Sequence, residues 1–246
     1  MVQLQCGSIV FHSVEAVIFD KDGTLANSQR FLRDLGSQRA SLIAAQFPVV
    51  EPYLLQAFGV TPDGIDPAGL MAVGTRQENE IAAAAYITAL GYGWIESLTQ
   101  AQRAFSSADT VFGRKAELTP LLDGTLDLIL TLVKAGIKLG IISADTPANV
   151  QDFVQFYELD LFIPVAIGSE LGLSKPNPGL LLQACDLLNT VAAKTIVIGD
   201  SKADIELACA ANAAGCVGVT WGGANLLDLT QATVVVHSPL EIRVLN

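Results

Sequence analysis

From Pro120 onward, short apolar runs that end in polar residues alternate with segments of helical periodicity. Short runs rich in β-branched residues are typical of buried strands, and apolar residues three or four positions apart are typical of helices. The expected strands span residues 138–142, 162–167, 195–198, 216–220 and 233–236, and the expected helices span 123–135, 147–157, 178–188 and 203–213. Such alternation predicts a parallel sheet with helices on both faces.

A further strand is predicted at residues 14–19, a β-branched and aromatic run that ends at Asp20. Residues 1–13 are mildly apolar and contain no Lys or Arg, so they lack the basic start of a secretory signal and are interpreted as a short strand or tail. The default expectation is therefore a cytoplasmic protein.

Between residues 28 and 108 the pattern predicts helices and no convincing strand. Apolar residues recur at helical spacing from Phe31 to Ile43, and further helices are expected at 77–90 and 95–105. Several prolines and glycines punctuate this segment. We interpret it as a helical insert between two parts of the α/β fold.

Three polar residues, Asp20, Ser143 and Asp200, stand at the carboxyl ends of predicted strands. In open parallel sheets ligands bind just beyond these ends, so the placement predicts a site there.

Composition and charge limit the kinds of partner and chemistry expected at that site. Apolar residues make up 51% of the 246 residues and no apolar run is long enough to span a bilayer. The 25 acidic residues outnumber the 14 basic ones, which argues against nucleic acid and anionic membranes as partners but leaves room for a local anion pocket. The four cysteines and two histidines show no metal-ligand or nucleophile pattern.

Asp20 and Asp22 flank one residue directly after a buried strand. Two carboxylates this close can take different roles, one ionised and one able to carry a proton. The alternatives are a solvated turn rich in Asp and Gly, or a calcium loop, although the later ligands and closing Glu of that loop are missing.

Ser143 could bind phosphoryl oxygens, or it could cap the helix that follows. Lys175, in Ser-Lys-Pro-Asn-Pro, offers a point charge on a backbone restrained by two prolines, or it is an exposed loop lysine. Asp204 lies four residues after Asp200 and can point back to the same strand end. Together with Asp20 these acids suit Mg²⁺, unless they only cap a helix.

In this order, Asp-x-Asp-Gly-Thr-Leu, the strand-end Ser, Lys-Pro and Gly-Asp-x3-Asp resemble the motifs of the haloacid dehalogenase-like (HAD) hydrolase superfamily. The general plan is similar to its phosphoglycolate phosphatase-like branch with an inserted helical cap. The resemblance implies an α/β fold with a Rossmann-like parallel-sheet core of residues 1–26 and 119–246, and an all-helical cap domain of residues 27–118.

The resemblance also implies catalytic roles. Asp20 is expected to be the nucleophile that forms an aspartyl-phosphate, and Asp22 the general acid that later activates water. Ser143 and Lys175 are expected to bind the phosphoryl group.

For the metal, the resemblance implies Mg²⁺ bound by Asp20, by the backbone carbonyl of Asp22 and by Asp200. Asp204 is expected to help directly, through water, or by orienting its neighbours.

The expected function is thus a magnesium-dependent phosphatase that hydrolyses a small phosphate monoester, with phosphoglycolate as the leading substrate. The alternatives are a phosphomutase of the same superfamily, a phosphorelay receiver-like signalling protein, and an inactive binding protein that kept the fold. The expected partner is a small phosphorylated metabolite, and the expected state is a monomer or homodimer.

Two positions depart from the family pattern where the substrate or its phosphate would be contacted. Many capped members have Asp-Ser where this chain has Asn27-Ser28, and many have Asn where it has Ala144. Four arginines of the insert are candidates for a substrate carboxylate, although solvated helix faces are the simpler interpretation: Arg30, Arg33, Arg76 and Arg103.

Overall fold

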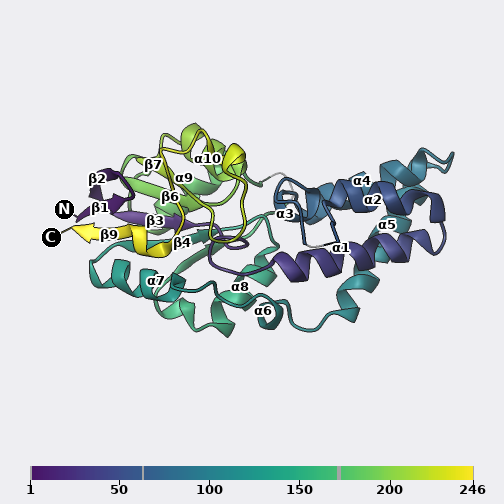
Figure 1. Cartoon of the computed structure of the whole chain (residues 1–246), viewed down its shortest axis with the longest axis horizontal. Helices are drawn as coiled ribbons and strands as arrows, with labels where there is room; N and C mark the ends of the chain where they lie inside the picture. Colours follow the sequence, from purple (N-terminus) through teal and green to yellow (C-terminus); the bar gives the residue numbers. More distant parts are fainter. Residues whose placement is uncertain (1, 63, 171–172, 246) are drawn as a thin grey trace. The chain divides into compact units, whose positions relative to one another are not determined.

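The computed structural model describes residues 2–62, 64–170 and 173–245. Positions 1 and 246, the outer ends of the expected core, lie outside the described residues. The chain divides into two compact units: one runs to Asn27 and resumes at Pro120, and the other comprises Ser28–Thr119 (Figure 1). The boundaries expected from the sequence each differ from this division by one residue.

The first unit is built on a six-stranded parallel sheet with the order β5-β4-β3-β6-β7-β8. Its strands are β3 (Ala16–Phe19), β4 (Lys138–Ile142), β5 (Val165–Ile167), β6 (Thr195–Gly199), β7 (Gly215–Val219) and β8 (Val234–Val236). This sheet order, with helices between consecutive strands, confirms the predicted α/β class.

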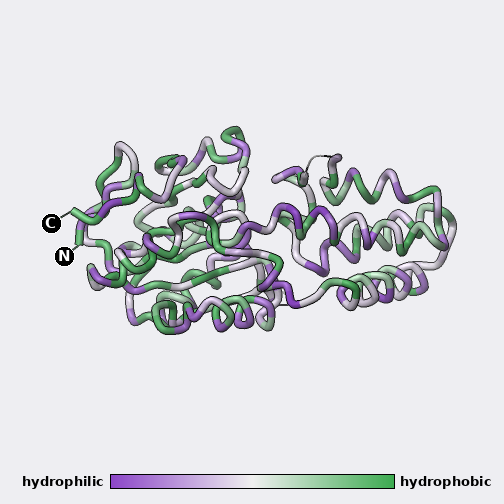
Figure 2. The backbone as a smooth tube through the Cα atoms, turned by 60° about the horizontal axis from the view of Figure 1, so that its bottom comes forward, coloured by the Kyte–Doolittle hydropathy of each residue, from purple (hydrophilic) through white to green (hydrophobic). Residues whose placement is uncertain are grey.

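Helices cover both faces of this sheet because side chains alternate along each strand. In β3, Val17 and Phe19 join one apolar cluster, whereas Ala16 and Ile18 join another. The first cluster packs against α7 (Thr125–Lys134) and α8 (Pro147–Phe156), and the second against α9 (Pro178–Leu187) and α10 (Lys202–Ala210). In Figure 2 hydrophobic and hydrophilic positions alternate along the helices.

A small antiparallel sheet joins the two ends of the chain. Its order is β2-β1-β9, with β1 (Val2–Cys6), β2 (Ile9–Val14) and β9 (Ile242–Leu245). The expectation of one strand at 14–19 is wrong at its start, because the chain bends at Ser13, where φ is +58°, and β3 begins only at Ala16. Likewise, the amino-terminal segment forms a hairpin and not a single strand or tail.

The second unit contains helices and no strand among its described residues. They are α1 (Gln29–Ala44), α2 (Glu51–Phe58), α3 (Leu70–Val73), α4 (Arg76–Thr88), α5 (Trp94–Val111) and α6 (Lys115–Leu118). This unit has an apolar core of its own, in which Phe58 and Phe105 meet edge to face. The insert is therefore a helical body with a separate core.

Short 3₁₀ helices complete the description: Pro48–Val50, Leu159–Leu161, Ala192–Lys194, Leu226–Leu229 and Pro239–Glu241. Among the described residues, no helix combines the length and the apolar character needed to cross a bilayer.

Candidate active site

Two aspartates stand side by side because their strands are paired. Phe19 lies opposite Ile198 in the parallel ladder between β3 and β6, and the Asp20 N–H donates to the Ile198 carbonyl at 2.8 Å. Asp20 therefore follows the last residue of β3, and Asp200 follows β6 at the same edge of the sheet. The expected position of both residues at strand ends is confirmed.

Asp204 reaches this edge from the first turn of α10. Ser201 caps the helix, and Asp204 Oδ2 accepts hydrogen bonds from the Ser201 N–H at 3.1 Å and the Ser201 Oγ at 2.6 Å. Gly199 leaves the space, since a Cβ there would overlap with the Asp204 carboxylate. The capping interpretation and the site interpretation of Asp204 are thus compatible.

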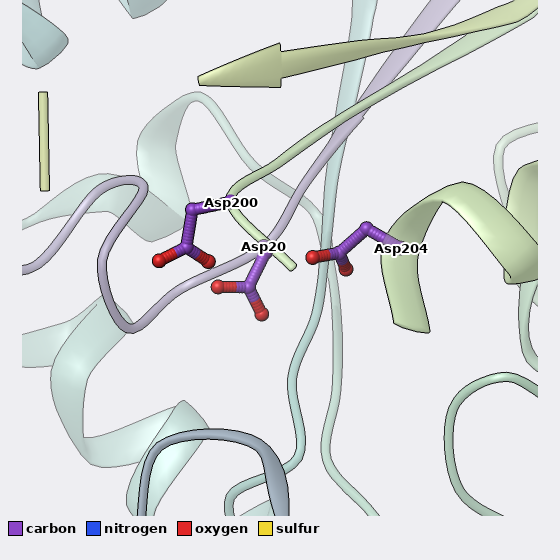
Figure 3. Close-up of side chains that lie close together, drawn as sticks. All are labelled: Asp20, Asp200 and Asp204. Atoms are coloured by element: carbon purple, nitrogen blue, oxygen red, sulfur yellow. The ribbon is translucent and has the colours of Figure 1, made fainter. Parts of the chain in front are cut away.

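Asp20, Asp200 and Asp204 form one acidic cluster, in which one ligand oxygen from each residue lies within 4.8 Å of the others. Figure 3 shows Asp20 between the other two, with the three carboxylates gathered in one place. Carboxylate oxygens at this spacing suit a hard divalent cation such as Mg²⁺.

Lys175 enters the cluster from the loop before α9. Its ammonium group donates to Asp20 Oδ1 and, at 2.7 Å, to Asp204 Oδ1. The lysine side chain is only 5% exposed. A segment 155 residues away in sequence thereby supplies a cation beside Asp20.

Burial and crowding shift the protonation equilibria of these groups. Burial raises the pKa of Asp20 to about 7, against the attraction of Lys175 and with added repulsion from Asp204. Burial, Asp20 and Asp204 also raise the pKa of Asp200 well above its usual range. For Lys175, burial lowers the pKa, but attraction to Asp20 and Asp204 outweighs it and the net shift is upward.

These shifts describe a site with more negative than positive charge. One ammonium group faces three carboxylates in a buried place, which disfavours the fully ionised state. A divalent cation would relieve that repulsion, so the residues present fit the expected metal.

The turn after β3 packs closely against its surroundings at Gly23. This residue has φ of +82°, and a Cβ on it would overlap with the Asp200 carboxylate. Gly222 packs against the same turn, and the neighbouring Trp221 Nε1 donates to the Thr24 carbonyl at 2.8 Å. The loop after β7 therefore supports the turn that carries Asp20 and Asp22.

Asp22 lies on this turn with a side chain that is 17% exposed. Its Oδ2 accepts a hydrogen bond from Lys21 Nζ at 2.6 Å, and Lys21 Nζ also lies 3.2 Å from Asp145 Oδ2. Our reasoning from the sequence missed Lys21. One signal was available in the sequence: a lysine stands close to a buried strand. Because lysines are rarely buried unless they are paired, this position suggests that Lys21 has a charged partner.

Ser143 directly follows β4, the other neighbour of β3, and is buried. Its Oγ accepts from the Asp145 N–H at 3.1 Å, and Thr146, not Ser143, caps α8. In the described part of the chain, no hydrogen bond joins Ser143 to Asp20 or Lys175. Ser143 thus stands at the same sheet edge but outside the bonded cluster.

The four candidate arginines of the helical unit have ordinary surroundings. Arg30 and Arg33 pair with Asp34, at 3.7 and 2.8 Å, and Arg76 pairs with Glu80 at 2.8 Å. Arg103 lines a surface cavity of about 380 Å³ within this unit. Arg30 and Arg33 fit the simpler interpretation of solvated, paired helix faces, whereas Arg76 also forms an ion pair with Asp109 of α5.

Comparisons with known proteins agree with this architecture. A family model described as haloacid dehalogenase-like hydrolase matches residues 14–212. The chain is 37% identical over 112 residues to a phosphoglycolate phosphatase of Colwellia psychrerythraea, a match that covers 45% of this chain and 49% of that protein. It is 27% identical over 235 residues to a phosphoglycolate phosphatase of Escherichia coli, and this match covers 93% of the chain and 90% of the relative.

Solved structures show the same fold. A haloacid dehalogenase-like family protein of Streptococcus pneumoniae superposes with a TM-score of 0.64 at 19% identity, over 93% of this chain and 96% of that chain.

Proposed function

Because the chain belongs to the haloacid dehalogenase-like hydrolase family and is a phosphatase, we propose that it hydrolyses a small phosphate monoester with Mg²⁺ through an aspartyl-phosphate on Asp20. One observation carries this proposal: Lys175 bridges the carboxylates of Asp20 and Asp204, with Asp200 in the same cluster. A buried nucleophile, a fixed cation and a place for a metal meet at one edge of the sheet.

In the first step, an oxygen of Asp20 attacks the phosphorus atom and the bond to the leaving oxygen breaks. Asp22, two residues further on the same turn, donates the proton that the leaving oxygen needs. In the second step, Asp22 takes a proton from water, and that water attacks the aspartyl-phosphate to release inorganic phosphate and restore Asp20.

Asp20, the Asp22 backbone carbonyl and Asp200 would hold the metal. When bound, Mg²⁺ supplies positive charge that offsets the negative charge of the carboxylates and of the phosphate ester. Lys175 adds a preorganised positive charge beside the attacking oxygen. Ser143, one strand away, would donate to a phosphoryl oxygen.

Asp204 is better suited to positioning than to direct metal binding. Its Oδ1 accepts from Lys175, and its Oδ2 accepts from Ser201 at the start of α10. Of the three roles expected from the resemblance, orienting its neighbours is the one that these contacts support.

The leading substrate is phosphoglycolate or a molecule like it. The curated relatives named phosphoglycolate phosphatase support this choice. The helical unit would act as a cap that sets specificity, and Arg103, at a cavity of that unit, is a candidate for contact with the substrate carboxylate. A phosphomutase would be recognised by isomerisation of a sugar phosphate without net release of phosphate.

A cytoplasmic location and a monomeric or homodimeric state stay predictions. Membership of a family of hydrolases leaves the receiver-like and inactive alternatives without support.

Turnover of p-nitrophenyl phosphate tests the proposed function. We expect phosphate release with Mg²⁺, none with excess chelator, and loss of at least about 10³-fold in kcat for Asp20→Asn, since the nucleophile is removed. A matched control is Asp123→Asn, which changes an exposed carboxylate of the same unit. Chelator-resistant turnover, or an active and folded Asp20→Asn variant, would refute the proposal.

A further inference from the structure

Lys21 is a buried lysine between the two aspartates of the turn. It directly follows Asp20 in sequence, and its side chain is 1% exposed. A buried ammonium group is costly unless charged or polar groups surround it. Its partners therefore indicate why a lysine occupies this place.

Two carboxylates and an aromatic ring surround the Lys21 ammonium group. It donates to Asp22 Oδ2 at 2.6 Å, lies 3.2 Å from Asp145 Oδ2, and stands 5.4 Å from the centre of the Phe153 ring. Asp22 belongs to the turn after β3, whereas Asp145 belongs to the loop after β4. Lys21 thus ties together two loops at the catalytic edge of the sheet.

The Asp145 end of this connection is anchored. Asp145 Oδ1 accepts from the Thr146 N–H at 2.9 Å and from Asn149 Nδ2 at 2.8 Å, at the start of α8. The Asp145 carbonyl accepts from the Ser169 N–H at 2.8 Å. A series of bonds therefore runs from the first turn of α8 through Asp145 and Lys21 to the Asp22 carboxylate.

We propose that Lys21 is a positioning residue that orients Asp22 for proton transfer to the leaving group. This inference rests on the proposed function, in which Asp22 is the general acid. The hydrogen bond from Lys21 to Oδ2 restrains the Asp22 carboxylate, and proton transfer requires the acid within hydrogen-bond distance of the leaving oxygen. Without Lys21, Asp22 stays in the chain but loses this hydrogen bond.

The competing interpretation is that Lys21 only stabilises the fold. The two interpretations differ in how the rate depends on the leaving group. A good leaving group such as p-nitrophenolate departs without a proton, whereas phenolate, a stronger base, depends on the general acid. A purely structural lysine would affect both substrates equally.

The test compares kcat/KM for p-nitrophenyl phosphate and phenyl phosphate in Lys21→Met. This parameter reports the steps up to loss of the leaving group, so the later use of Asp22 as a base does not enter. We expect kcat/KM for phenyl phosphate to fall by a further factor on the order of 10 or more relative to kcat/KM for p-nitrophenyl phosphate. This is a part of the ~10²–10⁴-fold that a positioned acid contributes.

The ratio of the two kcat/KM values is independent of how much of the variant is folded, because both substrates meet the same enzyme sample. Lys21→Met leaves Asp145 with one charged partner fewer, so the double variant Lys21→Met with Asp145→Asn removes both charges as a second measurement. It should show the same selective loss. The control Lys194→Met breaks an ion pair with Glu15, 2.6 Å long, at the opposite edge of the sheet and should leave the ratio unchanged.

An equal loss on both esters in Lys21→Met and in the double variant would overturn the inference. Asp22→Asn separates this failure from failure of the proposed function. If Asp22→Asn shifts the ratio and Lys21→Met does not, only the role of Lys21 is refuted. If Asp22→Asn leaves the ratio unchanged, Asp22 is not the acid, and the roles of both Asp22 and Lys21 are refuted, whereas the phosphatase proposal itself is tested by Asp20→Asn.

Discussion

At Asp20 the protein keeps a carboxylate where burial disfavours its charge. The attraction of Lys175 opposes that effect but does not cancel it, and Asp204 adds repulsion. Asp20, the proposed nucleophile, therefore depends on nearby positive charge to stay ionised, and a bound divalent cation would supply more of it. The contacts with Lys175 and Asp204 therefore determine both the protonation state of Asp20 and the cost of burying it.

This balance predicts how stability depends on pH in the absence of metal. A carboxyl group whose pKa is raised on folding stabilises the protein fully below the ordinary value, near 4, and loses that contribution as pH rises through the folded value, about 7 for Asp20. Asp200 shifts in the same direction. Because about two pH units lie between pH 5 and the folded pKa of Asp20, we expect chelated protein to lose about 2–3 kcal/mol of stability between pH 5 and pH 7.5.

Thermal unfolding at both pH values, with chelator and with Mg²⁺, checks this expectation. Mg²⁺ should raise Tm more at pH 7.5 than at pH 5, because it binds ionised carboxylates. Asp20→Asn should flatten the pH dependence of the chelated protein, whereas Asp123→Asn should not. An equal Mg²⁺ effect at the two pH values would contradict the argument.

Helix α10 serves the site through its first turn. Its capping box joins Ser201 and Asp204, and Asp204 in turn accepts from Lys175. The element thus places a carboxylate at the sheet edge with the same bonds that begin the helix.

Ser201→Ala should therefore affect both stability and turnover. Loss of the cap costs about 1 kcal/mol, and Asp204 loses the Ser201 Oγ bond that holds its carboxylate. We expect a fall in kcat of about 10-fold, since misplaced supporting groups reduce activity by ~10–100-fold.

The capping box of Thr75 and Glu78 at α4 offers the matched control. Urea unfolding should show that Thr75→Ala loses about as much stability as Ser201→Ala. The kcat of Thr75→Ala on p-nitrophenyl phosphate should stay within about 2-fold of the wild-type value, well below the ~10-fold effect expected for Ser201→Ala. Unchanged turnover in Ser201→Ala would argue against a positioning role for Asp204.

Elements with a strong local pattern were predictable from the sequence. The strand expected at 138–142 is found as Lys138–Ile142, because its apolar run has clear ends. Helix α2 was missed because Pro52 suggests a break, although proline is accepted in the first turn of a helix. Strand β9 was missed because only pairing with distant β1 makes it a strand.

The same limit applies to the site. Asp20 and Asp200 were placed by their strand ends, which a sequence shows directly. That Lys175 contacts both Asp20 and Asp204, and that Lys21 is buried beside Asp145, depends on loops that pack only in three dimensions. The residues that flank Lys175 and Lys21 in the sequence do not indicate these contacts.

On the scale of the whole molecule, the two units have separate apolar cores. One core contains Phe58 and Phe105 within the helical unit, and the other two flank the sheet. Bodies with separate cores can differ in stability, so unfolding need not be a single transition.

Phe105→Ala tests this independence. The side chain is fully buried, so its truncation should destabilise the helical unit by about 3–5 kcal/mol. Hydrogen exchange should rise across Ser28–Thr119, while β3 and β6 keep their protection.

Ile95→Ala in the same helix changes a side chain that is 75% exposed and should alter exchange little. A uniform rise in exchange over both units of Phe105→Ala would show that they unfold together.

The small terminal sheet has a practical consequence for attaching the enzyme to a surface. Gln3 pairs with Leu245, and Val2 pairs with Val14, just before β3 begins. Both ends of the described chain therefore lie beside the amino end of β3, whereas Asp20 follows its carboxyl end (Figure 1). An affinity tag at either end would tether the protein by the side remote from the reacting groups, and a short linker could join the two ends into a closed ring.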